Sequence, residues 1–148
     1  MILDAFNDSG GFTTKIHLRA NALVLPVANT LSTCEVSDYK GYQQVMDEEG
    51  PEPRVLLADK GYDADFIRED MEKRGGYAMI PTRSSQLVQI PVDRAIYALR
   101  NRIERCFNKH LKNARRIATR YDKTAASYRG FVNIVSLRLW LRTFVNTA

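Results

Sequence analysis

Two runs of apolar and polar side chains between residues 12 and 31 have the pattern of β-strands. Residues 12–20 alternate between the two kinds and are rich in β-forming side chains, and a similar run follows at residues 23–31. Asn21 and Ala22 between the two runs are suited to a tight turn. The pattern therefore predicts a β-hairpin.

The middle of the chain alternates short apolar runs with helical patterns. Helices are predicted from Ser37 onward and over residues 63–74, and short buried strands over residues 54–59 and 77–81, followed by a polar loop at 82–91. A hairpin followed by β-α-β units indicates an α/β domain with a mixed sheet, in which loops at the carboxyl ends of parallel strands bind ligands. Asp59 falls at such an end.

From about residue 93 the apolar period becomes helical. Ile96, Leu99, Ile103 and Phe107 recur three to four positions apart, which predicts one helix with a single apolar face. A second, more broadly apolar helix is predicted over residues 124–146, with Trp140 in the core.

The positive charge is concentrated in the last third of the chain. Residues 97–142 contain twelve Lys or Arg and two acids, whereas residues 1–96 contain ten basic and fifteen acidic side chains. A basic block on helical sequence favours a polyanion, DNA or RNA, as the partner. Glu104 is the single acid between residues 97 and 121, and its isolation among cations marks it as a candidate site residue.

Bulk composition is that of a globular cytoplasmic protein without a membrane span. The 148 residues suit one domain, and 45% are hydrophobic, but no apolar stretch approaches the ~20 residues that a membrane span requires. Cys34 and Cys106 match no metal or redox spacing, which favours reduced thiols in the cytoplasm. The first residues lack the pattern of a secretory signal.

Asp59 and Glu104 are 45 residues apart and could act together only if the fold brings them close. Two carboxylates beside a basic surface would suit Mg²⁺ and phosphoryl transfer on nucleic acid. Two simpler interpretations stay open. Asp59 can be a turn or N-cap residue, and Arg100 with Glu104 can be an ordinary i,i+4 helix pair.

Four strings of residues carry a family resemblance. They are GGFTTKIH at residues 10–17, LLADKGYD at 56–63, YALRNRIERCFNK at 97–109 and RRIATRYDK at 115–123. In this order they resemble the catalytic domain of bacterial insertion-sequence transposases of the DDE class. The resemblance implies a ribonuclease H-like mixed sheet flanked by helices, and strand cleavage and transfer at transposon ends in double-stranded DNA. It also implies Mg²⁺ or Mn²⁺ as the cofactor.

The resemblance also assigns roles to particular residues. Asp59 matches the second catalytic Asp and Glu104 the closing Glu, so both are expected to be catalytic metal ligands. Tyr97 and Arg100 match the Tyr-(2)-Arg-(3)-Glu signature and are expected to contact DNA. Further DNA contacts are expected from four basic residues of the following segment: Lys112, Arg115, Arg116 and Arg120.

The chain departs from the family pattern at two places. The signature Lys should follow the Glu by seven residues, but Lys112 follows Glu104 by eight, as if His110 were inserted. On a regular helix the extra residue would turn the following basic side chains away from Glu104. The family also places its first catalytic Asp upstream of residues 10–17, so we expect the first central strand to be missing or shortened. Asp4 could replace the acid if residues 1–6 form a strand; a frayed start with an incidental Asp is the alternative.

Together these features predict a single partial transposase catalytic domain over residues 1–148. Its sheet and crossover helices are expected in residues 10–92 and its basic helical part in 93–148. We expect a fragment or second-frame product that is inactive alone, whose partners would be transposon-end DNA, an upstream-frame product or a second copy on DNA. A non-catalytic DNA-binding remnant and a decayed product that does not fold stably are the alternatives.

Overall fold

The computed structural model describes residues 2–7, 14–33, 35–106, 114, 117 and 124–146, with the backbone alone for 2–7, 106 and 146. The strands are β1 (Ile2–Asn7), β2 (Thr14–Ala20), β3 (Pro26–Thr33), β4 (Val55–Leu57) and β5 (Tyr77–Met79). The helices are α1 (Asp38–Met46), the 3₁₀ turn η1 (Lys60–Tyr62), α2 (Asp65–Lys73), α3 (Arg94–Ala98), α4 (Asn101–Cys106) and α6 (Ala125–Asn146). The predicted hairpin, both short strands and the long last helix are confirmed.

The five strands form one mixed sheet in the order β3-β2-β1-β4-β5. β1, β2 and β3 pair antiparallel, whereas β1 pairs parallel with β4 through Ile2 and Leu57, and β4 pairs parallel with β5. The predicted α/β class with a mixed sheet is therefore confirmed. The middle strand of the sheet is the six-residue β1, so the strand considered for residues 1–6 is confirmed and a missing strand with a frayed start is wrong.

Side chains that alternate along the strands separate into two apolar clusters. The first contains Ile16, Leu18, Ala20, Leu57 and Met79 from the sheet, and it is closed by Ile103 of α4 and Tyr128 and Val132 of α6. The second contains Leu56, Ala58, Ala78 and Ile80, and it is closed by Tyr42 and Val45 of α1 and Ile67 and Met71 of α2. Because burying one such large apolar side chain contributes about 1.5–3 kcal/mol, these two clusters hold the layers together.

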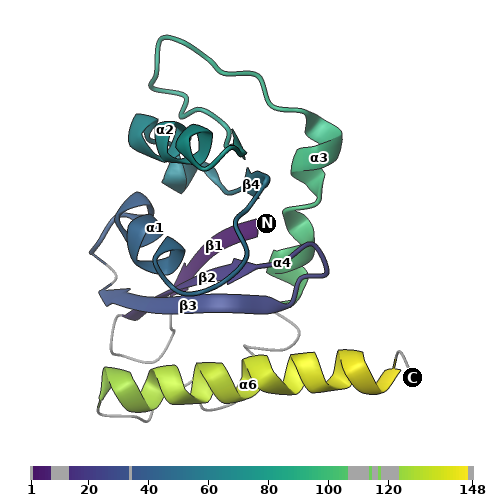
Figure 1. Ribbon diagram of the computed structural model, residues 1–148. Helices are drawn as coiled ribbons and strands as arrows, with labels where there is room; N and C mark the ends of the chain where they lie inside the picture. The colour runs from purple at the N-terminus through teal and green to yellow at the C-terminus, as the bar shows by residue number, and fades with distance from the viewer. Residues whose placement is uncertain are drawn as a thin grey trace.

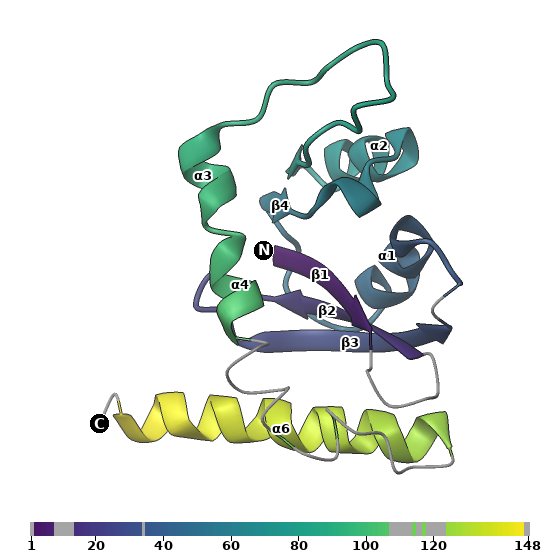
Figure 2. The same cartoon turned by 180° about the vertical axis from the view of Figure 1, so that it is seen from behind.

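The helices cover both faces of the sheet (Figure 1). α1 and α2 lie on one side, and α6 runs along β3 on the other, as the reverse view in Figure 2 also shows. Two polar contacts fasten α6 to β3. Trp140 donates from Nε1 to the carbonyl of Pro26 at 2.7 Å, and Asn29 donates from Nδ2 to Oδ1 of Asn133 at 2.6 Å.

The predicted helix from residue 93 is divided into two short helices. α3 ends at Ala98, and Leu99 and Arg100 form a turn before α4 begins. Backbone N–H groups of Leu99, Arg100, Arg102 and Ile103 donate to carbonyls three residues earlier, which is 3₁₀ geometry. The expected continuous apolar face is therefore wrong: Ile103 is buried, whereas Ile96 and Leu99 are exposed. Phe107 lies outside the described residues.

His17 of β2 is a buried side chain that is hydrogen-bonded through both ring nitrogens. Its Nδ1 lies 3.0 Å from the Tyr62 hydroxyl and its Nε2 lies 2.8 Å from Oγ of Ser32. Burial lowers the pKa of His17 to about 4, although the nearby Asp38 opposes this shift. Across the part of the chain that the structure describes, no helix is long and apolar enough to cross a membrane.

Candidate functional site

Asp59 lies in the turn that follows β4. Its Oδ1 accepts a hydrogen bond of 2.8 Å from the backbone N–H of Gly61, so the side chain caps the 3₁₀ turn η1. The capping role foreseen for this residue is therefore confirmed. The second carboxylate oxygen, Oδ2, makes no hydrogen bond with any described residue, and the residue is only half buried. Asp59 can thus hold the turn and still offer an oxygen to a ligand.

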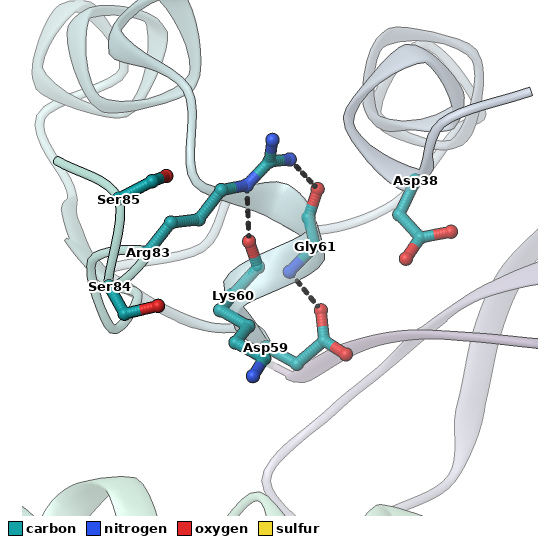
Figure 3. Close-up of a pocket in the computed structure, with 7 residues that line it drawn as sticks. All are labelled: Asp38, Asp59, Lys60, Gly61, Arg83, Ser84 and Ser85. Atoms are coloured by element: carbon teal, nitrogen blue, oxygen red, sulfur yellow. Dashed lines mark hydrogen bonds between the residues drawn. The ribbon is translucent and has the colours of Figure 1, made fainter.

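Arg83, on the loop after β5, fixes the turn that contains Asp59. It donates from Nε to the carbonyl of Lys60 and from Nη2 to the carbonyl of Gly61, both at 3.1 Å (Figure 3). The Arg83 backbone N–H donates to Oδ2 of Asp63 at 2.8 Å, and Arg68 donates to Oδ1 of the same buried carboxylate at 2.7 Å. Two separate loops are thereby joined beside Asp59.

A second carboxylate, that of Asp38 at the start of α1, approaches Asp59 across Gly61. A Cβ atom built on Gly61 would lie 2.3 Å from Oδ2 of Asp38 and 2.9 Å from Oδ1 of Asp59. Both acids therefore face the same small space, which only a glycine leaves open. Asp38 forms an ion pair of 2.7 Å with Lys15 of β2. From the sequence, Asp38 is only part of the helix predicted from Ser37 onward, since nothing in its local pattern indicates contact with a turn more than twenty residues later.

Asp38 and Asp59 line a pocket of about 450 Å³ together with Lys60, Gly61, Arg83, Ser84 and Ser85. Figure 3 shows the acids on one side of the Lys60–Gly61 turn and the two serines on the other. Sequence reasoning did not identify Arg83, Ser84 or Ser85, because their proximity to Asp59 depends on the pairing of β4 with β5. Lys60 directly follows Asp59 but was not singled out as a site residue.

Glu104 lies on α4, one residue after the fully buried Ile103. Ile103 packs in the same apolar cluster as Leu57 at the end of β4, which brings α4 beside the turn after that strand. Arg100 pairs with Glu104 at 2.9 Å, so the expected i,i+4 pair is confirmed. The Glu104 side chain is 44% exposed, and its Oε2 makes no hydrogen bond within the described part of the chain.

The hydroxyl of Tyr97 is affected by the charges of both Asp59 and Glu104. Burial raises the pKa of the Tyr97 hydroxyl, and the carboxylates of Asp59 and Glu104 raise it further, whereas Arg100 lowers it. The Arg100 guanidinium also lies 5.5 Å from the centre of the Tyr97 ring. Two acids that are 45 residues apart in sequence thus act on one hydroxyl.

The register of the sheet places Asp4 beside the turn that contains Asp59. Ile2 pairs with Leu57, and Asp4 and Asp59 each follow their paired residue by two positions. Asp4 lies in β1, whereas Asp59 lies in the turn just beyond the end of β4, so the two backbones are set side by side only by extension of this single pair. Within the described residues, no three His, Cys, Asp or Glu side chains are grouped as a metal site would require. The other expected DNA contacts, Lys112, Arg115, Arg116 and Arg120, and the insertion at His110, lie outside the residues that the structure describes.

Comparison with known proteins identifies the family to which this chain belongs. Residues 6–140 match the family described as the transposase DDE domain, and the chain belongs to this family. It is also 34% identical over 135 residues to a Brucella ovis protein that is named as a transposase for insertion sequence element IS6501. That match covers 88% of this chain and 99% of the relative. No solved structure matches the chain.

Proposed function

We propose that this protein acts in DNA transposition through metal-dependent cleavage and joining of DNA strands at the turn after β4. The observation that carries this proposal is the apolar cluster that contains both Ile103, next to Glu104, and Leu57, two residues before Asp59. It supports a shared site for the two acids, and both carboxylates also raise the pKa of the Tyr97 hydroxyl. Membership of the transposase DDE domain family supports the same chemistry.

We assign Asp59, Glu104 and Asp4 as the catalytic acids, with Asp59 and Glu104 as metal ligands. The first two fit a hard cation, because each keeps one carboxylate oxygen that makes no hydrogen bond with a described residue, and neither is fully buried. For Asp4, support comes from the backbone register of β1 against β4. When bound, Mg²⁺ or Mn²⁺ supplies Lewis-acid activation of a phosphodiester.

The other residues of the site orient these acids and bind the DNA. The Gly61 N–H fixes one oxygen of Asp59, and Arg100 holds Glu104 through one carboxylate oxygen. We propose that Tyr97 and Arg100 contact the DNA strand that lies against α3 and α4. In this proposal Lys112, Arg115, Arg116 and Arg120 bind backbone phosphates of the transposon end, since the segment that contains them is strongly basic.

We infer that the fold is ribonuclease H-like and that residues 1–148 form one catalytic domain. The central place of β1, with parallel β4 on one side and antiparallel β2 on the other, supports this inference, because the family resemblance implies a central strand with the first acid. The basic helical part from residue 93 would then form the DNA-binding side of the same domain.

The test compares variants in two assays. A labelled duplex carrying the DNA ends that flank the coding sequence is incubated with protein and Mn²⁺, and Mn²⁺ binding is measured separately by calorimetry. We expect Asp59→Asn and Glu104→Gln to lose strand cleavage and to bind Mn²⁺ at least tenfold more weakly. Asp65→Asn is the matched control, because Asp65 is an exposed acid in the first turn of α2. Wild-type cleavage by Asp59→Asn contradicts the proposal.

A second candidate function is DNA binding without catalysis. It is favoured by the basic segment from residue 97 to 142, with twelve Lys or Arg against two acids, because such a block binds a polyanion without requiring any chemistry. In that case the protein binds the duplex with steep salt dependence, cleaves nothing, and binds Mn²⁺ equally well with and without the Asp59 carboxylate. The calorimetric comparison therefore separates the two functions even if cleavage requires a further component.

A further inference from the structure

The pocket beside Asp59 has two chemically different sides. Asp38 and Asp59 supply carboxylates, whereas Lys60, Arg83, Ser84 and Ser85 supply hydrogen-bond donors, two of them cationic (Figure 3). A site for a cation alone would need only the carboxylates, so the donor side indicates a ligand that also carries acceptors or negative charge. The pocket's volume of about 450 Å³ lies within the ~300–1,000 Å³ of small-ligand sites, enough for a single sugar-phosphate unit but not for a duplex.

The donor side is rigid because Arg83 is fixed at three points. Its backbone N–H donates to the buried Asp63, and its guanidinium donates to the carbonyls of Lys60 and Gly61. The planar guanidinium can span both carbonyls at once, which a Lys ammonium would do poorly. The turn that contains Lys60 and the loop that contains the two serines are therefore joined, and Asp59 directly precedes Lys60 in the turn.

The Lys60 ammonium is available for an external anion. It forms no hydrogen bond or ion pair with any residue that the structure describes, and the residue is exposed. Asp38, one of the two acids that line the pocket, is already paired with Lys15 at 2.7 Å. Ser84 and Ser85 are also exposed, so their hydroxyl groups can turn toward a ligand.

We propose that Lys60, with the hydroxyl groups of Ser84 and Ser85, binds a backbone phosphate of the DNA strand that passes Asp59. This phosphate is a neighbour of the one that reacts, since Lys60 directly follows Asp59 in the turn. The inference rests on the proposed function for the identity of the polyanion. Its role is positioning: an anchored neighbouring phosphate fixes the strand along the carboxylates, and it carries no sequence information.

Salt dependence of DNA binding gives a direct count of such contacts. Each phosphate that a cation neutralises contributes about 0.9 to the slope of log K against log salt on duplex DNA, and about 0.7 on single strands. Lys60→Ala should therefore reduce this slope by the contribution of one phosphate contact, about 0.9 on duplex DNA or about 0.7 on single strands. The difference between duplex and single-stranded probes tells which form of DNA occupies the pocket.

The experiment measures fluorescence anisotropy of labelled duplex and single-stranded oligonucleotides between 50 and 300 mM KCl on the intact chain, with EDTA present. We expect Lys60→Ala to weaken binding about three- to tenfold at 100 mM and to reduce the slope. The double variant Ser84→Ala/Ser85→Ala should weaken binding with an unchanged slope, because it removes donors but no charge. Lys73→Ala is the matched control, an exposed lysine in the last turn of α2. A cooperative thermal melt of each variant checks that it folds.

The outcomes separate this inference from the proposed function. If Lys60→Ala keeps the wild-type slope while Asp59→Asn loses cleavage and Mn²⁺ binding, the phosphate contact is wrong and the catalytic proposal stands. If Lys60→Ala reduces the slope while Asp59→Asn cleaves normally, the contact stands and the catalytic proposal is wrong. Failure of the wild-type chain to bind either probe at 50 mM salt overturns both.

Discussion

Asp38 and Asp59 present their carboxylates to the same side of Gly61, although Asp38 begins helix α1 and Asp59 caps the turn after β4. A Cβ on Gly61 would lie 2.3 Å from an oxygen of Asp38, closer than any unstrained contact allows. Since Asp38 is held by Lys15 and Asp59 by the Gly61 N–H, neither carboxylate can move without losing a partner.

Gly61→Ala should therefore destabilise the fold and disturb the candidate site. We expect a loss of about 1–3 kcal/mol in the free energy of unfolding, the usual cost of overpacking, and weaker Mn²⁺ binding. Gly130→Ala in α6 is the matched control. Nothing lies within 4 Å of a Cβ built there, so replacing this helical glycine should stabilise the protein by about 0.5–1 kcal/mol. Urea unfolding measures both, and equal behaviour of the two variants would show that the space at Gly61 is open.

Removing Arg68 should leave the Asp63 carboxylate buried without its charged partner. The Asp63 side chain is 2% exposed and pairs with Arg68 at 2.7 Å, so Arg68→Met should reduce the free energy of unfolding by about 3–5 kcal/mol. Arg54→Met, at an exposed position, should change it by less than about 0.5 kcal/mol. The double variant Arg68→Met/Asp63→Asn should recover part of the lost free energy of unfolding, as measured by urea unfolding. If the double variant is no more stable than Arg68→Met, the pair is not coupled as described.

Stability should fall as the pH drops from about 6.5 toward 4 because His17 is buried in its neutral form. Burial lowers the pKa of folded His17 from 6.5 to about 4, so in this window the unfolded chain binds the proton and the folded one does not. The full loss in the free energy of unfolding from this group is about 3 kcal/mol; it is present below pH 4 and absent above pH 6.5.

His17→Gln provides the control for that prediction, since an amide can bond to Tyr62 and Ser32 but does not titrate. Urea unfolding at several pH values between 4 and 7 should give a shallower pH dependence for the variant than for the wild type. Carboxylates that titrate in the same range contribute to both proteins and cancel in the difference. Parallel curves for the two proteins would contradict a neutral buried His17.

Trp140 should report the docking of α6 on β3. Trp140→Phe removes the hydrogen bond of 2.7 Å to the Pro26 carbonyl and should reduce the free energy of unfolding by about 1–2 kcal/mol. Leu141→Ala is the neighbouring control: Leu141 is 55% exposed, and its truncation should have an effect below about 0.5 kcal/mol. Equal urea midpoints for the two variants would show that α6 does not depend on this contact.

The amino-acid pattern predicted the elements whose signal is local. The hairpin follows from the alternation over residues 12–20 and the turn at Asn21, and α6 follows from a long apolar helical pattern. Asp59 was identified because a short apolar run ends there, just before Gly61, and the strand and turn confirm its position. These features depend on the residues within each segment and on little else.

The features that were missed depend on contacts between distant segments. β1 has six residues with no strict alternation, and it is a strand because β2 and β4 supply hydrogen bonds on both sides. The break between α3 and α4 contains neither Gly nor Pro, and it coincides with the burial of Ile103 against the sheet. The same long-range pairing decides which side chains surround Asp59, so Arg83 had no signal in its own neighbourhood.

The middle position of β1 also has a consequence for synthesis on the ribosome. This strand is translated before either neighbour, and β4, which completes its pairing, follows about fifty residues later. At roughly 5–20 residues per second, the open edge of β1 waits about 3–10 s for its partner. During that interval the nascent hairpin offers unpaired backbone groups to other chains. Production of this protein should therefore benefit from a chaperone that shields β1, β2 and β3 until β4 emerges.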